Sequence, residues 1–159
     1  MLPVGISAPD FELYSSPDQK IRLTELKEKN VILAFYPADW SPVWGSQMNL
    51  YNEMEEYFTR YNAQLLGISV DSRWCHAAFS EQNGFYFPLL ADFEPKGAVS
   101  KSYEAYDEIT GECRRALYVI DEEGMIIWSY LSPIDVNPGA DVILRALEIS
   151  ETLKTIELW

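Results

Sequence analysis

The sequence has few of the residues on which most metal centres and disulfide scaffolds depend. Its 159 residues include two cysteines, Cys75 and Cys113, and one histidine, His76. Two cysteines are too few for a disulfide scaffold and lack the paired spacing of a structural zinc site. A single histidine excludes a centre of several imidazoles and leaves the Ser-His-Asp chemistry of hydrolases one candidate base. We therefore expect no metal and no cofactor.

Positive charge and long apolar runs are also scarce. Twelve lysines and arginines face 25 aspartates and glutamates, which gives a formal net charge of −13. Such a surface repels phosphates and anionic head groups, so we expect neither nucleic acid nor membrane as a partner. No apolar run approaches the roughly 20 residues of a membrane-spanning helix. Residues 1–5 lack the basic and apolar regions of a secretory signal, so a cytoplasmic location is the default expectation.

What is present is a hydrophobic content of 48%, enough for the core of one domain spanning residues 1–159. Residues 31–36 are apolar at every position and predict a strand buried on both faces; residues 65–70 predict a second. Between them, apolar residues recur every three or four positions and predict one helix that begins shortly after Pro42. This helix carries Met48, Tyr51, Met54, Phe58 and Tyr61 on one stripe.

The remaining elements complete an α/β pattern. We expect an N-terminal hairpin around Pro17 and Asp18, helices over 74–82 and 97–106, and a short extended piece at 87–90. A hairpin with strands 116–121 and 125–130 turns at Gly124. The chain ends in an amphipathic helix after Pro138, whose predicted inner side carries Val142, Ile143, Ala146, Ile149, Leu153 and Ile156. This order predicts a thioredoxin-like fold, a central mixed β-sheet flanked by helices.

One segment suggests chemistry. Residues 35–45 read Phe-Tyr-Pro-Ala-Asp-Trp-Ser-Pro-Val-Trp-Gly. A strand that ends in proline and leads into a helix brings unpaired backbone N–H groups and the positive end of the helix dipole to one place. An anionic group is stabilised there.

The same segment resembles the active-site loop of peroxiredoxins, in which proline is followed four residues later by Thr or Ser and three further on by the peroxide-attacking cysteine. Pro37 and Ser41 match this loop, and Trp44 stands where the cysteine is expected. Residues 8–13, 68–71 and 115–121 also resemble family segments in the expected order, so the resemblance covers essentially the whole chain.

The resemblance implies a thiol peroxidase that reduces hydrogen peroxide or organic hydroperoxides with a dithiol reductant such as thioredoxin. It implies that Ser41 hydrogen-bonds the peroxide and Pro37 shields the pocket from water. It also implies that Arg115 stabilises the thiolate and the transition state. If residues 114–121 form a strand, the side chain of Arg114 points to the side opposite to that of Arg115. Because dimers are usual in the family, a homodimer is expected.

Trp44 conflicts with this chemistry. An indole offers one N–H donor and does not ionise near neutral pH, so it cannot replace a thiolate. Its size would also fill or distort a pocket built for one peroxide. We therefore expect the chain as written to be inactive at position 44.

Three interpretations of Trp44 stand side by side. Trp44 replaces a reactive cysteine, or a selenocysteine whose UGA codon was translated as tryptophan, in an active parent. Alternatively, the protein is a natural non-catalytic redoxin-like binding or regulatory protein, and Trp44 is a surface residue that contacts its binding partner. In the third interpretation the chemistry has moved to Cys75. The codon at position 44 distinguishes a native tryptophan from a recoded or replaced residue.

The two cysteines and the histidine have plainer interpretations too. Cys75 resembles the resolving cysteine of some monomeric peroxiredoxins, which captures the oxidised residue as a disulfide. It is otherwise a small residue of a helix. We expect His76 to be a helix-surface histidine, Asp39 to order the turn after the strand, and Cys113 to be incidental.

Overall fold

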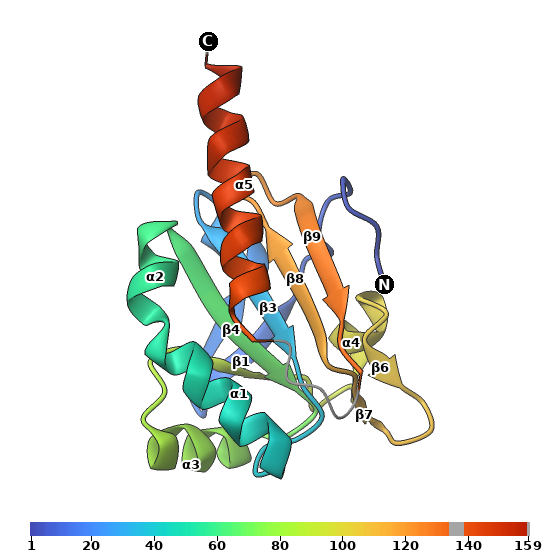
Figure 1. The fold of residues 1–159 in the computed structure, drawn as a ribbon. Coiled ribbons are helices and arrows are strands. Elements are labelled where there is room, and N and C mark those ends of the chain that lie inside the picture. The colour runs from blue at the N-terminus through green and yellow to red at the C-terminus, as the bar shows by residue number, and fades with distance from the viewer. Residues whose placement is uncertain (134–138, 159) are drawn as a thin grey trace.

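The computed structural model describes residues 1–133 and 139–158, without the side chains of residues 43–45. A seven-stranded mixed sheet with strand order β2-β1-β5-β4-β3-β8-β9 forms the centre of the molecule (Figure 1). Its strands are β1 (Glu12–Ser16), β2 (Gln19–Arg22), β3 (Asn30–Phe35), β4 (Ala63–Ser69), β5 (Leu89–Ala91), β8 (Ala116–Ile120) and β9 (Ile126–Leu131). A separate ribbon pairs β6 (Tyr106–Asp107) with β7 (Glu112–Cys113). The expected mixed sheet flanked by helices is confirmed.

The helices are α1 (Pro42–Glu53), α2 (Glu55–Arg60), α3 (Arg73–Asn83), α4 (Ala98–Ser102) and α5 (Asp141–Glu157), with a 3-10 turn, η1 (Leu23–Leu26). Alternate residues of β3 point to opposite faces of the sheet, as a strand dictates. Ile32 and Ala34 belong to a core cluster shared with α1, α2 and α5. Leu33 and Phe35 belong to the cluster on the other face. The all-apolar strand predicted from the sequence is thus buried on both faces.

The directions of β3, β4, β5 and β8 determine which connecting segments lie at the same edge of the sheet. β3 and β4 are parallel, as are β4 and β5, whereas β8 runs antiparallel to β3. Phe35, the last residue of β3, pairs with Ile68 on one side and Ala116 on the other. The segments that follow β3, β4 and β5, together with the one that precedes β8, therefore leave the same edge of the sheet.

Two predicted helices differ from those observed. The helix after Pro42 is two helices, because α1 ends at Glu53 and α2 begins at Glu55, with Met54 between them. The helix expected over 97–106 extends only over α4, since Tyr106 instead opens the β6–β7 ribbon. Ribbon strands of two residues are too short to produce a hydrophobic period.

The terminal helix corrects a second expectation. Pro138 lies outside the described residues, and α5 begins at Asp141. Ile143 and Leu147 are its fully buried residues. Four residues predicted for its inner side are instead 40 to 61% exposed, namely Val142, Ile149, Leu153 and Ile156. A helix with apolar residues on two stripes buries the stripe that meets the sheet, and periodicity alone does not identify that stripe. Among the described residues, no helix is both long enough and apolar enough to cross a membrane.

Candidate active site

The loop between β3 and α1 carries two of the residues singled out from the sequence. Pro37 follows the last residues of the buried strand, and Ser41 is the N-cap residue of α1, with Pro42 as its first helical residue. Pro at this position fits the helix, because the missing N–H has no intrahelical partner there. The strand, proline and helix start are thus arranged as predicted.

Within the described part of the chain, the N-cap side chain leaves the N-terminus of α1 uncapped. Ser41 has the extended backbone of an N-cap residue, but its hydroxyl makes no capping hydrogen bond, and the first turn contains no acidic residue. Its Oγ is buried and has no hydrogen-bond partner among the described residues. A buried, unsatisfied hydroxyl costs free energy unless a ligand or water satisfies it. The site therefore combines an available donor with the positive end of a helix dipole.

Position 44 is the third residue of α1. The prediction that it lies in the first helical turn is confirmed for the backbone; its side chain lies outside the described part of the structure. The backbone of this residue lies in the first turn of α1, three positions after Ser41.

Arg115 comes to the same edge from the other side of β3. It immediately precedes Ala116, which pairs with Phe35, so it lies where the β3–α1 loop begins. Arg115 is 6% exposed and Arg114 is exposed, although both residues precede β8 and the strand expected to begin at 114 begins at Ala116. A buried guanidinium, a helix N-terminus and a free hydroxyl all favour a negatively charged or polarised group at this edge.

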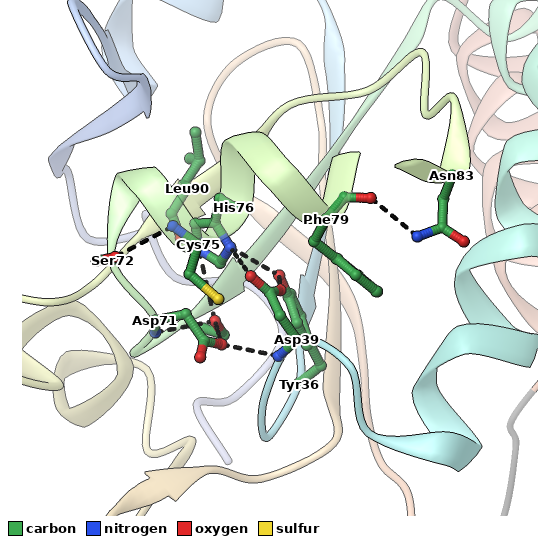
Figure 2. A network of polar contacts seen from close by, with 10 residues as sticks. Tyr36, Asp39, Asp71, Ser72, Cys75, His76, Phe79, Asn83 and Leu90 are labelled. Carbon is green, nitrogen blue, oxygen red and sulfur yellow. Dashed lines mark hydrogen bonds and ion pairs between the residues drawn. The ribbon is translucent and has the colours of Figure 1, made fainter. Parts of the chain in front are cut away.

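A network of buried polar side chains joins the loop to α3 (Figure 2). Asp39 accepts a hydrogen bond from the Tyr36 hydroxyl at 2.6 Å through Oδ1. Its Oδ2 lies 2.7 Å from Nδ1 of His76. The other ring nitrogen of His76, Nε2, lies 3.1 Å from the carbonyl oxygen of Leu90. The network therefore connects the ends of β3 and β5 with the first turns of α3.

Asp71 connects the same loop to β4. Its Oδ2 accepts a hydrogen bond from the backbone N–H of Asp39 at 2.9 Å and another from the Ser69 hydroxyl at 2.5 Å. The backbone of Asp39 is thus held by one carboxylate while its side chain holds His76. These contacts fix the loop that leads to Ser41.

The contacts of His76 hold its ring in place. Nδ1 faces the carboxylate of Asp39 and Nε2 faces the carbonyl oxygen of Leu90, and both of these groups are hydrogen-bond acceptors. Burial, and next the charge of Asp39, raise the pKa of Tyr36 well above its usual value, so its hydroxyl remains a donor. The expectation of a surface histidine is wrong, since His76 is 3% exposed. Asp39 does order the turn, but through contacts with distant elements.

Cys75 lies next to this network on α3. Burial, and then the nearby Asp39 carboxylate, raise its pKa to about 11. At neutral pH it is therefore a thiol, which is a poor nucleophile. Cys113 is buried, and burial raises its pKa to about 12. Its sulfur lies 2.9 Å from the hydroxyl of Ser100. Neither cysteine has the environment of an activated thiolate.

One group of side chains has the composition of a metal site. Ligand atoms of Asp39, Asp71 and Cys75 all lie within 4.8 Å of one another. Both oxygens of Asp39 and Oδ2 of Asp71 already accept hydrogen bonds from protein groups. A cation here would share the Asp39 carboxylate with Tyr36 and His76.

Sequence reasoning missed the roles of Tyr36, His76 and Asp71. A signal for part of the network was present, because Asp39 and Asp71 each follow a buried strand. The ends of neighbouring parallel strands meet at one edge of the sheet. Nothing in the pattern pointed to His76, whose partners come from three different elements.

Comparisons with known proteins agree with this geometry. A family model described as the AhpC/TSA family matches residues 4–129. Alkyl hydroperoxide reductase E of Mycobacterium tuberculosis is 35% identical over 127 residues, covering 79% of this chain and 83% of that protein. Peroxiredoxin-1 of Gekko japonicus is 31% identical over 156 residues, covering 91% of this chain and 77% of that protein. The crystal structure of Enterococcus faecalis AhpC superposes with a TM-score of 0.88 at 25% identity, covering 98% of this chain and 96% of that one.

Proposed function

Because the chain belongs to the AhpC/TSA family of peroxiredoxins, we propose that it is a hydroperoxide-reducing framework in which position 44 alone lacks the reactive group. One observation carries the proposal. Pro37 and Ser41 lie in the segment that joins β3 to α1, and Arg115 precedes the β8 residue that pairs with the last residue of β3. The Ser41 hydroxyl has no hydrogen-bond partner among the described residues.

Each of these groups has a defined task when a thiolate occupies position 44. The helix N-terminus and the Arg115 guanidinium lower the pKa of that thiol, because both favour its charged form. The Ser41 hydroxyl donates a hydrogen bond to the peroxide. Pro37 covers the pocket and contributes no N–H that would bind water.

The thiolate sulfur attacks one peroxide oxygen and the O–O bond breaks. The other oxygen leaves with a proton as water or an alcohol. The sulfur is oxidised to a sulfenic acid while the peroxide is reduced. A dithiol reductant of the thioredoxin type supplies the two electrons that restore the thiol. Arg115 stabilises the negative charge that develops on the leaving oxygen.

With Trp44 in place the chain does not carry out this reaction. An indole has no thiolate, and Cys75 does not substitute for one, because its pKa of about 11 keeps it protonated at neutral pH. Cys75 is instead proposed as the resolving thiol of an active parent: its sulfur bonds to the sulfur of the sulfenic acid at position 44, the S–O bond breaks and water leaves.

The test compares this chain with its Trp44→Cys variant by stopped-flow oxidation with hydrogen peroxide, followed by intrinsic fluorescence and thiol counting. We expect rapid oxidation of the variant alone. If neither protein reacts, the framework is not a peroxidase site and a non-catalytic redoxin-like binding function replaces this proposal. Rapid oxidation of the unaltered chain would assign the nucleophile to Cys75 or Cys113.

The origin of Trp44 is tested separately by the intact mass of the protein from its native source. A selenocysteine or cysteine at position 44 gives a mass different from that of tryptophan. Either of these masses supports an active parent. A mass that matches tryptophan at position 44 supports a protein that naturally lacks peroxidase activity.

A further inference from the structure

Gln47 of α1 carries a buried oxygen atom whose hydrogen-bonding capacity is unused. The residue is 1% exposed. Its Nε2 donates a hydrogen bond to the hydroxyl of Tyr51 at 2.7 Å, and that hydroxyl donates in turn to the carbonyl oxygen of Gly139 at 3.3 Å. Oε1 has no hydrogen-bond partner among the described residues. A buried acceptor without a donor costs free energy, so its presence in a folded protein calls for an explanation.

Gln47 lies beside position 44 on the helix. It follows residue 44 by three positions within α1, and residues three apart are neighbours on the surface of a helix. The Cα–Cβ bonds of a helix tilt towards its N-terminus, so the side chain of Gln47 leans towards the turn that contains residue 44. The unused oxygen of Gln47 therefore belongs to the same end of α1 as the buried hydroxyl of Ser41, which also has no partner among the described residues.

The other buried side-chain oxygens of this kind lie away from the candidate site. Within the described part of the chain they belong to Asn30 and Tyr86. Asn30 is the first residue of β3, and Tyr86 precedes β5, which runs in the same direction as β3. Both residues therefore lie towards the edge of the sheet opposite to the loop of Ser41. The two unused oxygens on the side of the candidate site are those of Ser41 and Gln47.

These two groups match different parts of a hydroperoxide. A hydroperoxide has lone pairs on both oxygens and a single O–H donor, on its terminal oxygen. The Ser41 hydroxyl and the Arg115 guanidinium are donors and suit the lone pairs, whereas an amide oxygen only accepts. The O–H of the hydroperoxide needs an acceptor, and Oε1 of Gln47 is an acceptor that no described residue uses.

We propose that Oε1 of Gln47 accepts a hydrogen bond from the O–H of the hydroperoxide and orients it for attack. This inference rests on the proposed function and adds a substrate-contacting residue to it. The thiolate sulfur at position 44 bonds to the oxygen that carries this proton, and the proton stays there as the hydroxyl of the sulfenic acid. The O–O bond breaks, and the other oxygen leaves with the bonding electrons and takes up a proton from water. The hydrogen bond to Gln47 is thus retained throughout the step.

The test uses the Trp44→Cys protein and compares two reagents. Hydrogen peroxide carries the O–H that the proposal requires, whereas methyl methanethiosulfonate modifies the same thiolate and has no hydrogen-bond donor. In this background Gln47→Met keeps the length of the side chain and removes the acceptor. It should lower the second-order rate constant with hydrogen peroxide about tenfold and change that with methyl methanethiosulfonate less than about twofold. Stopped-flow fluorescence measures the first rate, and thiol counting measures the second.

Two further variants separate the acceptor from the fold. Gln47→Glu keeps an acceptor oxygen at the same place and should react with hydrogen peroxide within about threefold of the Trp44→Cys protein, at a pH at which the thiol is ionised. The matched control is Asn49→Leu, which removes an exposed amide two positions further along α1 and should leave both rates unchanged. In urea, Gln47→Met should unfold at nearly the same concentration as its parent, because the loss of the hydrogen bond to Tyr51 is offset by the removal of an unsatisfied oxygen.

The outcomes distinguish this inference from the proposed function. A Trp44→Cys protein that does not react with hydrogen peroxide overturns both. If that protein reacts, an unchanged rate in Gln47→Met overturns this inference alone. So does an equal loss of rate with both reagents, which would mean that Gln47 acts on the thiol or on the fold. A Gln47→Glu protein as slow as Gln47→Met would also overturn it, because the N–H donor to Tyr51, and not the acceptor, would then support the reaction.

Discussion

Nδ1 of His76 lies 2.7 Å from Oδ2 of Asp39, and the two side chains are 3% and 0% exposed. This pair connects the first turns of α3 with the loop that carries Ser41, although its members are 37 positions apart in the sequence. A buried hydrogen bond is costly to break, because removing one member leaves the other buried without a partner. The geometry of the candidate site thus depends on a contact made outside it.

Replacing His76 by alanine should lower the free energy of unfolding by about 1 to 3 kcal/mol, because the buried side chain of Asp39 loses a hydrogen-bond partner. Urea unfolding at pH 7, followed by fluorescence, measures the change. The matched control is Arg60→Ala, which removes the 62%-exposed partner of Glu56. It should cost less than about 1 kcal/mol, as exposed pairs do. Equal effects of the two substitutions would mean that the buried contact between His76 and Asp39 stabilises the fold no more than an exposed pair does.

Cys75 should react slowly with alkylating reagents at neutral pH. Its pKa of about 11 leaves little thiolate, so the rate of carbamidomethylation should rise about tenfold per pH unit between pH 7 and 10. Asp71→Asn removes one of the carboxylates that raise this pKa and should accelerate the reaction at pH 8. Mass spectrometry of the labelled protein measures both.

The control for that labelling is Cys75→Ser. Its remaining thiol, Cys113, is 2% exposed and has a pKa of about 12, so the folded variant should take up no label and the urea-unfolded variant one. Rapid labelling of the unaltered chain at pH 7 would contradict the assignment of Cys75 as a protonated thiol.

Much of the fold could be predicted because it follows from local sequence. The all-apolar run ending at Tyr36, the proline that begins α1 and the glycine of the β8–β9 turn each act within a few residues. Pro37, Ser41 and Arg115 were identified by resemblance, and strand register brings them to one edge of the sheet.

The rest depends on which elements pack together. His76 is buried because α3 lies against the ends of β3 and β5, and a single histidine in a helix shows nothing of this beforehand. Likewise, α5 has apolar residues on two sides. Ile143 and Leu147 are buried because their side packs against the sheet, whereas Leu153 is exposed. The spacing of apolar residues identifies an apolar side of a helix, but it does not show which of two apolar sides is buried.

Gly67 illustrates a packing constraint inside the sheet. A Cβ at this position of β4 would lie 2.8 Å from Cδ2 of Leu89, closer than carbon atoms approach. Gly67→Ala should therefore destabilise the protein by about 1 to 3 kcal/mol. In the double variant Gly67→Ala/Leu89→Val the clashing methyl is gone, and the loss should be smaller than the sum of the two single effects. Simple additivity in urea unfolding would refute the clash.

Arg115 should set both the reactivity and the acidity of a thiol at position 44. In the Trp44→Cys background, Arg115→Gln should lower the second-order rate of oxidation by hydrogen peroxide by about 10²- to 10³-fold, because charge developing on the leaving oxygen loses its cation. The same substitution should raise the pKa of that thiol, which alkylation rates measured against pH report. Arg114→Gln is the matched control, since Arg114 is the exposed neighbour of the buried Arg115 and should change the rate less than threefold. If Arg114→Gln slows oxidation as much as Arg115→Gln, general electrostatic attraction by the two arginines, and not a positioned guanidinium, supports the reaction.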